Sequence, residues 1–210
     1  MKSLDNFKVI KDEVYKLQSK SNLIVVTKNQ TFNSILPIIE SGHIHFGENR
    51  VQEAKEKWGS FLSNNKNIKL HLLGKLQSNK AKEAFALFDF IHTLDSIKLA
   101  KIFFELEKNS NKKINYFIQI NIGNESQKSG IDQSLAKEFI NFCKFELKLN
   151  VIGLMCIPPA NVDPFSFFKK MQDINTSNNL IELSMGMSAD YKEALSCKST
   201  FVRIGSAIFK

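Results

Sequence analysis

Apolar residues along this chain alternate between short continuous runs and longer stretches spaced by three and four. The segment LIVVTK at 23–28 has four apolar residues followed by threonine and lysine. Short runs rich in Val and Ile are typical of strands buried on both faces, as in a parallel sheet. Residues 4–18 instead have apolar side chains at helical spacing, from Leu4 to Leu17, and predict an amphipathic helix.

The same alternation continues to the end of the chain. Strands are predicted at 23–28, 43–46, 69–73, 90–94, 114–122, 151–157, 180–183 and 200–204, each followed by a helical or turn segment. Strict alternation favours a parallel sheet with right-handed crossovers. Eight such units in one domain, residues 1–210, predict an α/β fold: a single (β/α)8 TIM-type barrel with an extra N-terminal helix.

The carboxyl ends of the eight strands would meet at one mouth, where barrels bind their ligands. Lys28 ends the first strand. Partial burial there favours the neutral amine, which is the form that attacks a carbonyl carbon. The other interpretation is that Lys28 is simply the first solvated residue after a strand.

Two turns rich in glycine and serine follow the last two strands, where barrels often bind phosphate. They are Ser184-Met185-Gly186-Met187-Ser188 and Arg203-Ile204-Gly205-Ser206. The glycines allow backbone N–H groups to approach an oxyanion, and the serine hydroxyls add donors. Ordinary tight turns would have the same composition. Together with the lysine, these turns suggest a phosphorylated aldehyde bound as a Schiff base, and pyridoxal 5'-phosphate is the leading candidate.

Composition narrows the classes of partner. The chain has 29 Lys+Arg against 21 Asp+Glu, a net charge of +8, which favours an anionic partner. The lysines are dispersed, so nucleic-acid binding is not expected. Three widely spaced cysteines predict reduced thiols. We expect a soluble cytoplasmic protein without a membrane partner, because neither a signal peptide nor an apolar run of ~20 residues occurs.

Eight segments covering most of the chain carry a resemblance to a known family. They are VVTK (25–28), FGENRVQE (46–53), HLLGKLQSNK (71–80), QINI (119–122), KSGI (128–131), GLM (153–155), LSMGMSAD (183–190) and VRIGSAIF (202–209). In this order they resemble the YggS/PROSC family of pyridoxal phosphate homeostasis proteins, whose barrel is similar to the N-terminal domain of bacterial alanine racemase. Arg50 stands where the family usually has tyrosine, a difference that could alter the rim of the pocket.

The resemblance implies roles for individual residues. Lys28 would hold the cofactor as a Schiff base, Asn49 would approach it from the second loop, and Arg203 would face the pyridine nitrogen. The phosphate would be held by the two turns, at Ser184, Met185, Gly186, Gly205 and Ser206. A guanidinium opposite the ring nitrogen disfavours protonation of that nitrogen and thereby limits carbanion chemistry.

The resemblance also implies a carrier or regulator of the cofactor without robust catalytic activity. Such a protein would serve apo-enzymes that depend on pyridoxal phosphate, as a monomer or weak dimer. A free-standing racemase is the alternative. It would lack a second base, because the 210 residues contain no counterpart of the domain that supplies racemases with a catalytic tyrosine.

A metal-dependent hydrolase is a further interpretation. His43 and His45 share one face of a predicted strand, and His71 and His92 lie on neighbouring strands. All four fall at or before the middle of their strands, away from the mouth. The sequence therefore favours histidines in the core or at the opposite face of the barrel over metal ligands.

Overall fold

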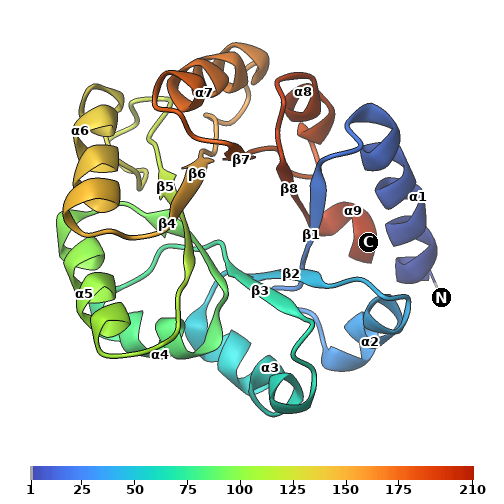
Figure 1. Ribbon diagram of the computed structural model, residues 1–210. Coiled ribbons are helices and arrows are strands. Elements are labelled where there is room, and N and C mark those ends of the chain that lie inside the picture. The colour runs from blue at the N-terminus through green and yellow to red at the C-terminus, as the bar shows by residue number, and fades with distance from the viewer. Residues whose placement is uncertain (1) are drawn as a thin grey trace.

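A computed structural model describes residues 2–210. Its eight parallel strands form one closed barrel in the order β1 to β8 (Figure 1). The strands are β1 (Asn22–Val26), β2 (His45–Glu48), β3 (Lys69–Leu72), β4 (Phe90–Leu94), β5 (Asn115–Gln119), β6 (Val151–Met155), β7 (Glu182–Ser184) and β8 (Phe201–Ile204). Pairing of β8 with β1, from Phe201 beside Asn22 to Ile204 beside Val25, closes the ring. The predicted barrel is confirmed.

Helices form the outer layer of the barrel. They are α2 (Phe32–Glu40), α3 (Val51–Asn64), α4 (Ala81–Leu87), α5 (Ile97–Lys108), α6 (Ala136–Asn141), α7 (Phe165–Ser177), α8 (Tyr191–Ser196) and α9 (Ser206–Phe209). The 3-10 turns η1 (Ser78–Lys80) and η2 (Gln133–Leu135) lead into α4 and α6, and a π-helical turn, η3 (Phe142–Glu146), extends α6. No helix among residues 2–210 is long and apolar enough to cross a membrane.

The N-terminal helix α1 (Lys2–Leu17) occupies the eighth position of the outer ring. Helix α9 has only four residues, too few to cover the gap between β8 and β1. Figure 1 shows α1 in that gap, between α8 and α2. Its apolar face buries Phe7, Ile10 and Val14, and Glu13 forms an ion pair with Lys192 of α8 at 2.6 Å. The predicted extra helix therefore completes the barrel.

Side chains point alternately outward and inward along each strand, so one set packs against the helices and the other fills the barrel. The apolar part of the interior consists of Ile24, Leu73, Phe117, Met155 and Phe201. Polar residues also point inward from β2, β3, β4, β7 and β8. Together these side chains extend from His45 on β2 to Arg203 on β8, which lies at the mouth.

Several strand ends at the mouth differ from the prediction. β1 ends at Val26 and not at Lys28, so Lys28 lies two residues beyond the strand and is exposed instead of partly buried. β5 and β6 end at Gln119 and Met155, earlier than the expected residues 122 and 157.

β2 begins and ends two residues later than expected, so Glu48 lies inside the strand and is fully buried. β7 ends at Ser184 instead of at residue 183, so this serine belongs to the strand and not to the following turn. The predicted ends of β2 and β7 were wrong because apolar runs mark buried positions. Polar residues with buried hydrogen-bond partners can extend a strand beyond its apolar run.

Candidate functional site

A cavity of about 350 Å³ lies at the mouth of the barrel, a volume typical of small-ligand sites. Its lining residues are Val26, Lys28, Asn49, Leu73, Ile157, Met187, Ser188, Ala189, Arg203, Gly205 and Ser206. The lining thus has two cationic side chains and no carboxylate. A site of this charge favours an anionic ligand. Five of the residues expected at the site from the sequence, Lys28, Asn49, Arg203, Gly205 and Ser206, are among those that line this cavity.

Hydrogen bonds hold the backbone in place on both sides of Lys28. Before it, the buried Thr27 donates its hydroxyl hydrogen bond to Glu48 Oε1 at 2.6 Å. After it, Asn29 has a left-handed φ of 59° and donates its N–H to Glu53 Oε1 at 2.6 Å. Asparagine is one of the few residues other than glycine that readily adopts this conformation. These contacts fix the backbone position from which the exposed Lys28 side chain extends.

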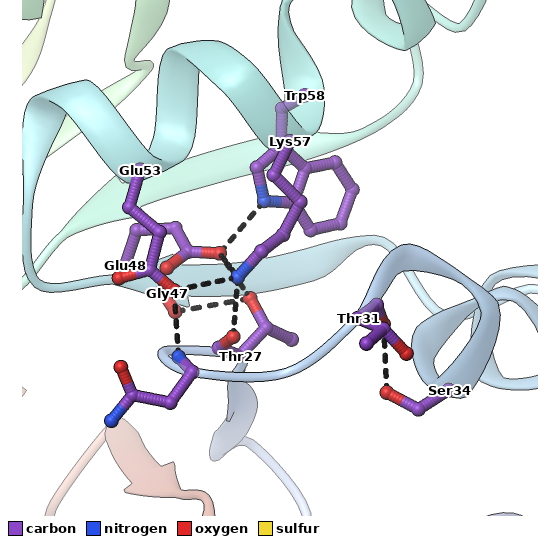
Figure 2. A network of polar contacts seen from close by, with 9 residues as sticks. Thr27, Thr31, Ser34, Gly47, Glu48, Glu53, Lys57 and Trp58 are labelled. Carbon is purple, nitrogen blue, oxygen red and sulfur yellow. Dashed lines mark hydrogen bonds and ion pairs between the residues drawn. The ribbon is translucent and has the colours of Figure 1, made fainter.

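A buried ion pair between Glu48 and Lys57 stabilises the backbone next to Lys28. Glu48 Oε1 accepts hydrogen bonds from Lys57 Nζ and Trp58 Nε1, both at 2.9 Å, as well as from Thr27. Lys57 Nζ also donates to the Thr27 carbonyl oxygen at 2.6 Å and to Glu53 Oε1 at 3.0 Å. The lysine side chain is only 8% exposed. The pair thereby connects α3 to the residue that precedes Lys28, as Figure 2 shows.

Two glycines bring neighbouring loops close enough to form the cavity wall. A Cβ atom on Gly74 would lie 2.1 Å from the carbonyl oxygen of Asn49, so any other residue would displace the second loop. A Cβ atom on Gly205 would lie 3.0 Å from the carbonyl oxygen of Val26. The eighth loop can therefore lie against the end of β1 and leave its backbone facing the cavity.

Arg203 forms the inner wall of the cavity. It points into the barrel from β8 and is 4% exposed. Its Nη1 donates to Ser184 Oγ at 2.7 Å, and its Nη2 donates to the carbonyl oxygen of Cys156 at 2.9 Å. Burial lowers the pKa of the guanidinium from its ordinary value, but arginine keeps its charge in proteins. The cavity thus has a positive charge in a fixed position.

The remaining predicted residues, Ser184, Met185 and Gly186, do not line the cavity. All three are buried. Ser184 still belongs to β7, and its hydroxyl lies inside the barrel with the Arg203 guanidinium. From this motif it is Ser188, four residues later, that lines the cavity; it was included in the predicted turn but not among the expected site residues. The motif contains both serines, and only the true end of β7 distinguishes them.

Other parts of the mouth extend this site or lie outside it. A second cavity of about 330 Å³ adjoins the first and shares Asn49, Leu73 and Ile157 with it. Arg50 is exposed and lines neither cavity. Within residues 2–210, no group of three or more His, Cys, Asp or Glu side chains is arranged to hold a metal ion.

Comparisons with known proteins agree with this geometry. The family model for the N-terminal domain of alanine racemase matches residues 4–210. The pyridoxal phosphate homeostasis protein of Haemophilus influenzae is 36% identical over 207 residues, covering 91% of this chain and 85% of that protein. The corresponding protein of Escherichia coli K12 is 32% identical over 196 residues, covering 89% of this chain and 84% of that protein.

Solved structures agree as well. PipY of Synechococcus elongatus PCC7942 with PLP bound has a TM-score of 0.88 and 30% identity, covering 99% of this chain and 100% of that one. Alanine racemase of Corynebacterium glutamicum is 16% identical, with a TM-score of 0.72 over 99% of this chain and 60% of that one, which supports the fold alone. The chain belongs to the family of pyridoxal phosphate homeostasis proteins, which is built on the alanine racemase N-terminal domain.

Proposed function

We propose that this protein binds pyridoxal 5'-phosphate in the cavity at the barrel mouth and serves in the homeostasis of that cofactor. The observation that carries the proposal is a lysine on a fixed backbone and a buried guanidinium lining one cavity free of carboxylates. The bound PLP of PipY, which is 30% identical to this chain, supports the choice of ligand.

In this proposal the polar and charged lining residues hold the cofactor. Lys28 would hold the cofactor, because its amine is the group of this lining that can condense with an aldehyde with loss of water. Ser188 and the backbone of Gly205 and Ser206 hold the phosphate, because they line the cavity beside Lys28. The phosphate role expected for Ser184 thus passes to Ser188. Arg203 would face the ring nitrogen, and Asn49 would contact the ligand from the second loop.

The same residues favour carriage over catalysis. When bound, pyridoxal phosphate supplies an electron sink whose strength depends on protonation of its ring nitrogen. The positive Arg203 opposes that protonation. The cavity lining contains no His, Tyr, Cys, Asp or Glu to serve as a second acid or base opposite Lys28. We therefore expect no robust racemase activity, and we propose that apo-enzymes dependent on pyridoxal phosphate are the partners.

The three cysteines support a cytoplasmic location. Cys143, Cys156 and Cys197 are all buried and none forms a disulfide. Free thiols are typical of a reducing compartment.

An absorbance titration with pyridoxal phosphate tests the proposal. Wild-type protein should show a saturable spectral change, and Lys28→Ala should show none. Lys75→Ala is the matched control, because Lys75 is an exposed lysine that lines only the adjoining cavity, and it should titrate like wild type. A loss of the spectral change in both variants, or in neither, would contradict the role of Lys28. Measurable interconversion of D- and L-alanine by the wild type would favour the racemase alternative.

A further inference from the structure

Three imidazoles form a continuous hydrogen-bonded series inside the barrel. His45 Nδ1 lies 3.0 Å from His71 Nε2, and His71 Nδ1 lies 2.9 Å from His92 Nε2. His92 Nδ1 in turn lies 2.8 Å from Ser184 Oγ. We call His45, His71 and His92 the histidine column. It begins at the first residue of β2, near the end of the barrel opposite the mouth, and reaches Arg203 through Ser184.

The two inner histidines are held without access to water. His71 and His92 are 0% exposed. The His71 ring stacks on Phe90 with centroids 4.2 Å apart, and the His92 ring stacks on Phe117 at 4.3 Å. Burial holds the pKa of both well below the ordinary value, and the nearby Arg203 lowers the pKa of His92 further. Each ring is therefore neutral near pH 7, with one N–H and one lone pair.

Arg203 sets the direction of every hydrogen bond in this series. A guanidinium can only donate, so Ser184 Oγ accepts from Arg203 Nη1. Among residues 2–210, the other hydrogen-bond partner of this hydroxyl is His92 Nδ1. The serine proton therefore goes to His92. Because each neutral ring has a single proton, His92 then donates from Nε2 to His71, and His71 donates from Nε2 to His45.

We propose that the histidine column is a positioning device that fixes Ser184 and, through it, the guanidinium of Arg203. The column connects the cavity to the opposite end of the barrel, because reversing the donor and acceptor of any one of its hydrogen bonds would require reversing all of them. Its last member, His45, is half-buried, with His43, Lys69 and Asp89 as the other titratable groups near it.

A proton added at His45 would oppose this arrangement. A charged imidazole donates from both nitrogens, so His45 would donate to His71 and turn the series around. Ser184 would then accept from His92 as well as from Arg203, and its own proton would have no acceptor. In this proposal the position of the Arg203 guanidinium therefore depends on the charge of His45, at the far end of the barrel.

Long-range ¹H–¹⁵N NMR of the cofactor-free protein tests the column directly, independently of the proposed function. Wild-type His71 and His92 should each show a protonated Nε2 and a bare Nδ1 at pH 7. Ser184→Ala should convert them to a mixture of tautomers. Ser199→Ala is the matched control, because Ser199 is equally buried and its hydroxyl, within the part of the chain that the structure describes, hydrogen-bonds only to backbone carbonyls. A wild-type Nδ1–H tautomer, or Ser184→Ala spectra identical to wild type, would overturn the proposal.

A second experiment tests the effect on Arg203 and rests on the proposed function. His92→Leu removes the acceptor of the Ser184 proton, and we expect the Kd for pyridoxal phosphate to rise roughly tenfold, the typical effect of one buried hydrogen bond. His92→Asn keeps an acceptor oxygen close to the Nδ1 position and should restore most of the affinity. Equal losses in the two variants would refute the positioning role. Absence of binding by wild-type protein would refute the proposed function instead and leave the NMR result to decide the column.

Discussion

The ion pair between Glu48 and Lys57 allows a quantitative test of what holds Lys28 in place. Lys57→Met keeps the length of the side chain but removes its charge and its three hydrogen bonds. The fully buried Glu48 would keep its contacts with Thr27 and Trp58 but lose its only positive partner among residues 2–210. Within the described residues 2–210, its Oε2 already has no hydrogen-bond partner.

Removing one member of a buried ion pair typically costs about 3–5 kcal/mol, because the other charge remains desolvated. We expect the free energy of unfolding of Lys57→Met to fall by this amount. Such a loss is a large part of the ~5–15 kcal/mol that stabilises an ordinary domain. Adding Glu48→Gln should recover roughly half of the loss, because the double variant has no unpaired buried charge while Gln can still accept from Thr27 and Trp58.

Urea denaturation followed by circular dichroism measures these differences. Lys55→Met is the matched control on the same helix, because Lys55 is 63% exposed and lies 3.6 Å from Glu83. Its denaturation midpoint should coincide with that of the wild type, as is usual for surface pairs. A loss below about 1 kcal/mol in Lys57→Met, or a double variant less stable than Lys57→Met, would refute the reasoning.

Three further predictions follow from particular contacts. Gly74→Ala should reduce stability by about 1–3 kcal/mol, because its Cβ would collide with the Asn49 carbonyl, whereas Gly59→Ala on α3 meets nothing within 4 Å and should not destabilise; thermal unfolding compares them. Burial lowers the pKa of His43 to about 3 and that of His45 to about 4, from the ordinary value of 6.5. The unfolded chain therefore binds more protons, and the free energy of unfolding should fall as the pH decreases below 6.5; urea titrations at several pH values would measure this, and a flat profile would contradict it. The three buried cysteines should react with a thiol reagent only after unfolding, and rapid labelling of native protein would count against the packing around them.

Much of the fold was predictable because hydrophobic periodicity reports burial directly. Eight apolar runs identified eight strands, and strict alternation with helices identified the closed barrel. Since parallel strands all end at one mouth, the same pattern also placed Lys28, Asn49 and Arg203 near one another.

The details that the sequence did not reveal depend on polar contacts between distant segments. Glu48 could not be recognised as a strand residue, because its burial requires Lys57 and Trp58 from the following helix and Thr27 from the loop after β1. Ser184 was assigned to the turn after β7 because the apolar run ended one residue before the strand did. The histidines were expected in the core or at the opposite face of the barrel, but the hydrogen bonds of the histidine column followed from no local pattern, since its members come from three different strands.

Reduction with borohydride followed by peptide mass spectrometry tests the central claim most directly. Protein mixed with pyridoxal phosphate and then reduced should carry the added mass of the cofactor on the peptide that contains Lys28, in a one-to-one ratio. The exposed Lys75 should remain unmodified under the same conditions. Modification spread over many surface lysines, or absent from Lys28, would contradict the claim that this barrel binds the cofactor at Lys28.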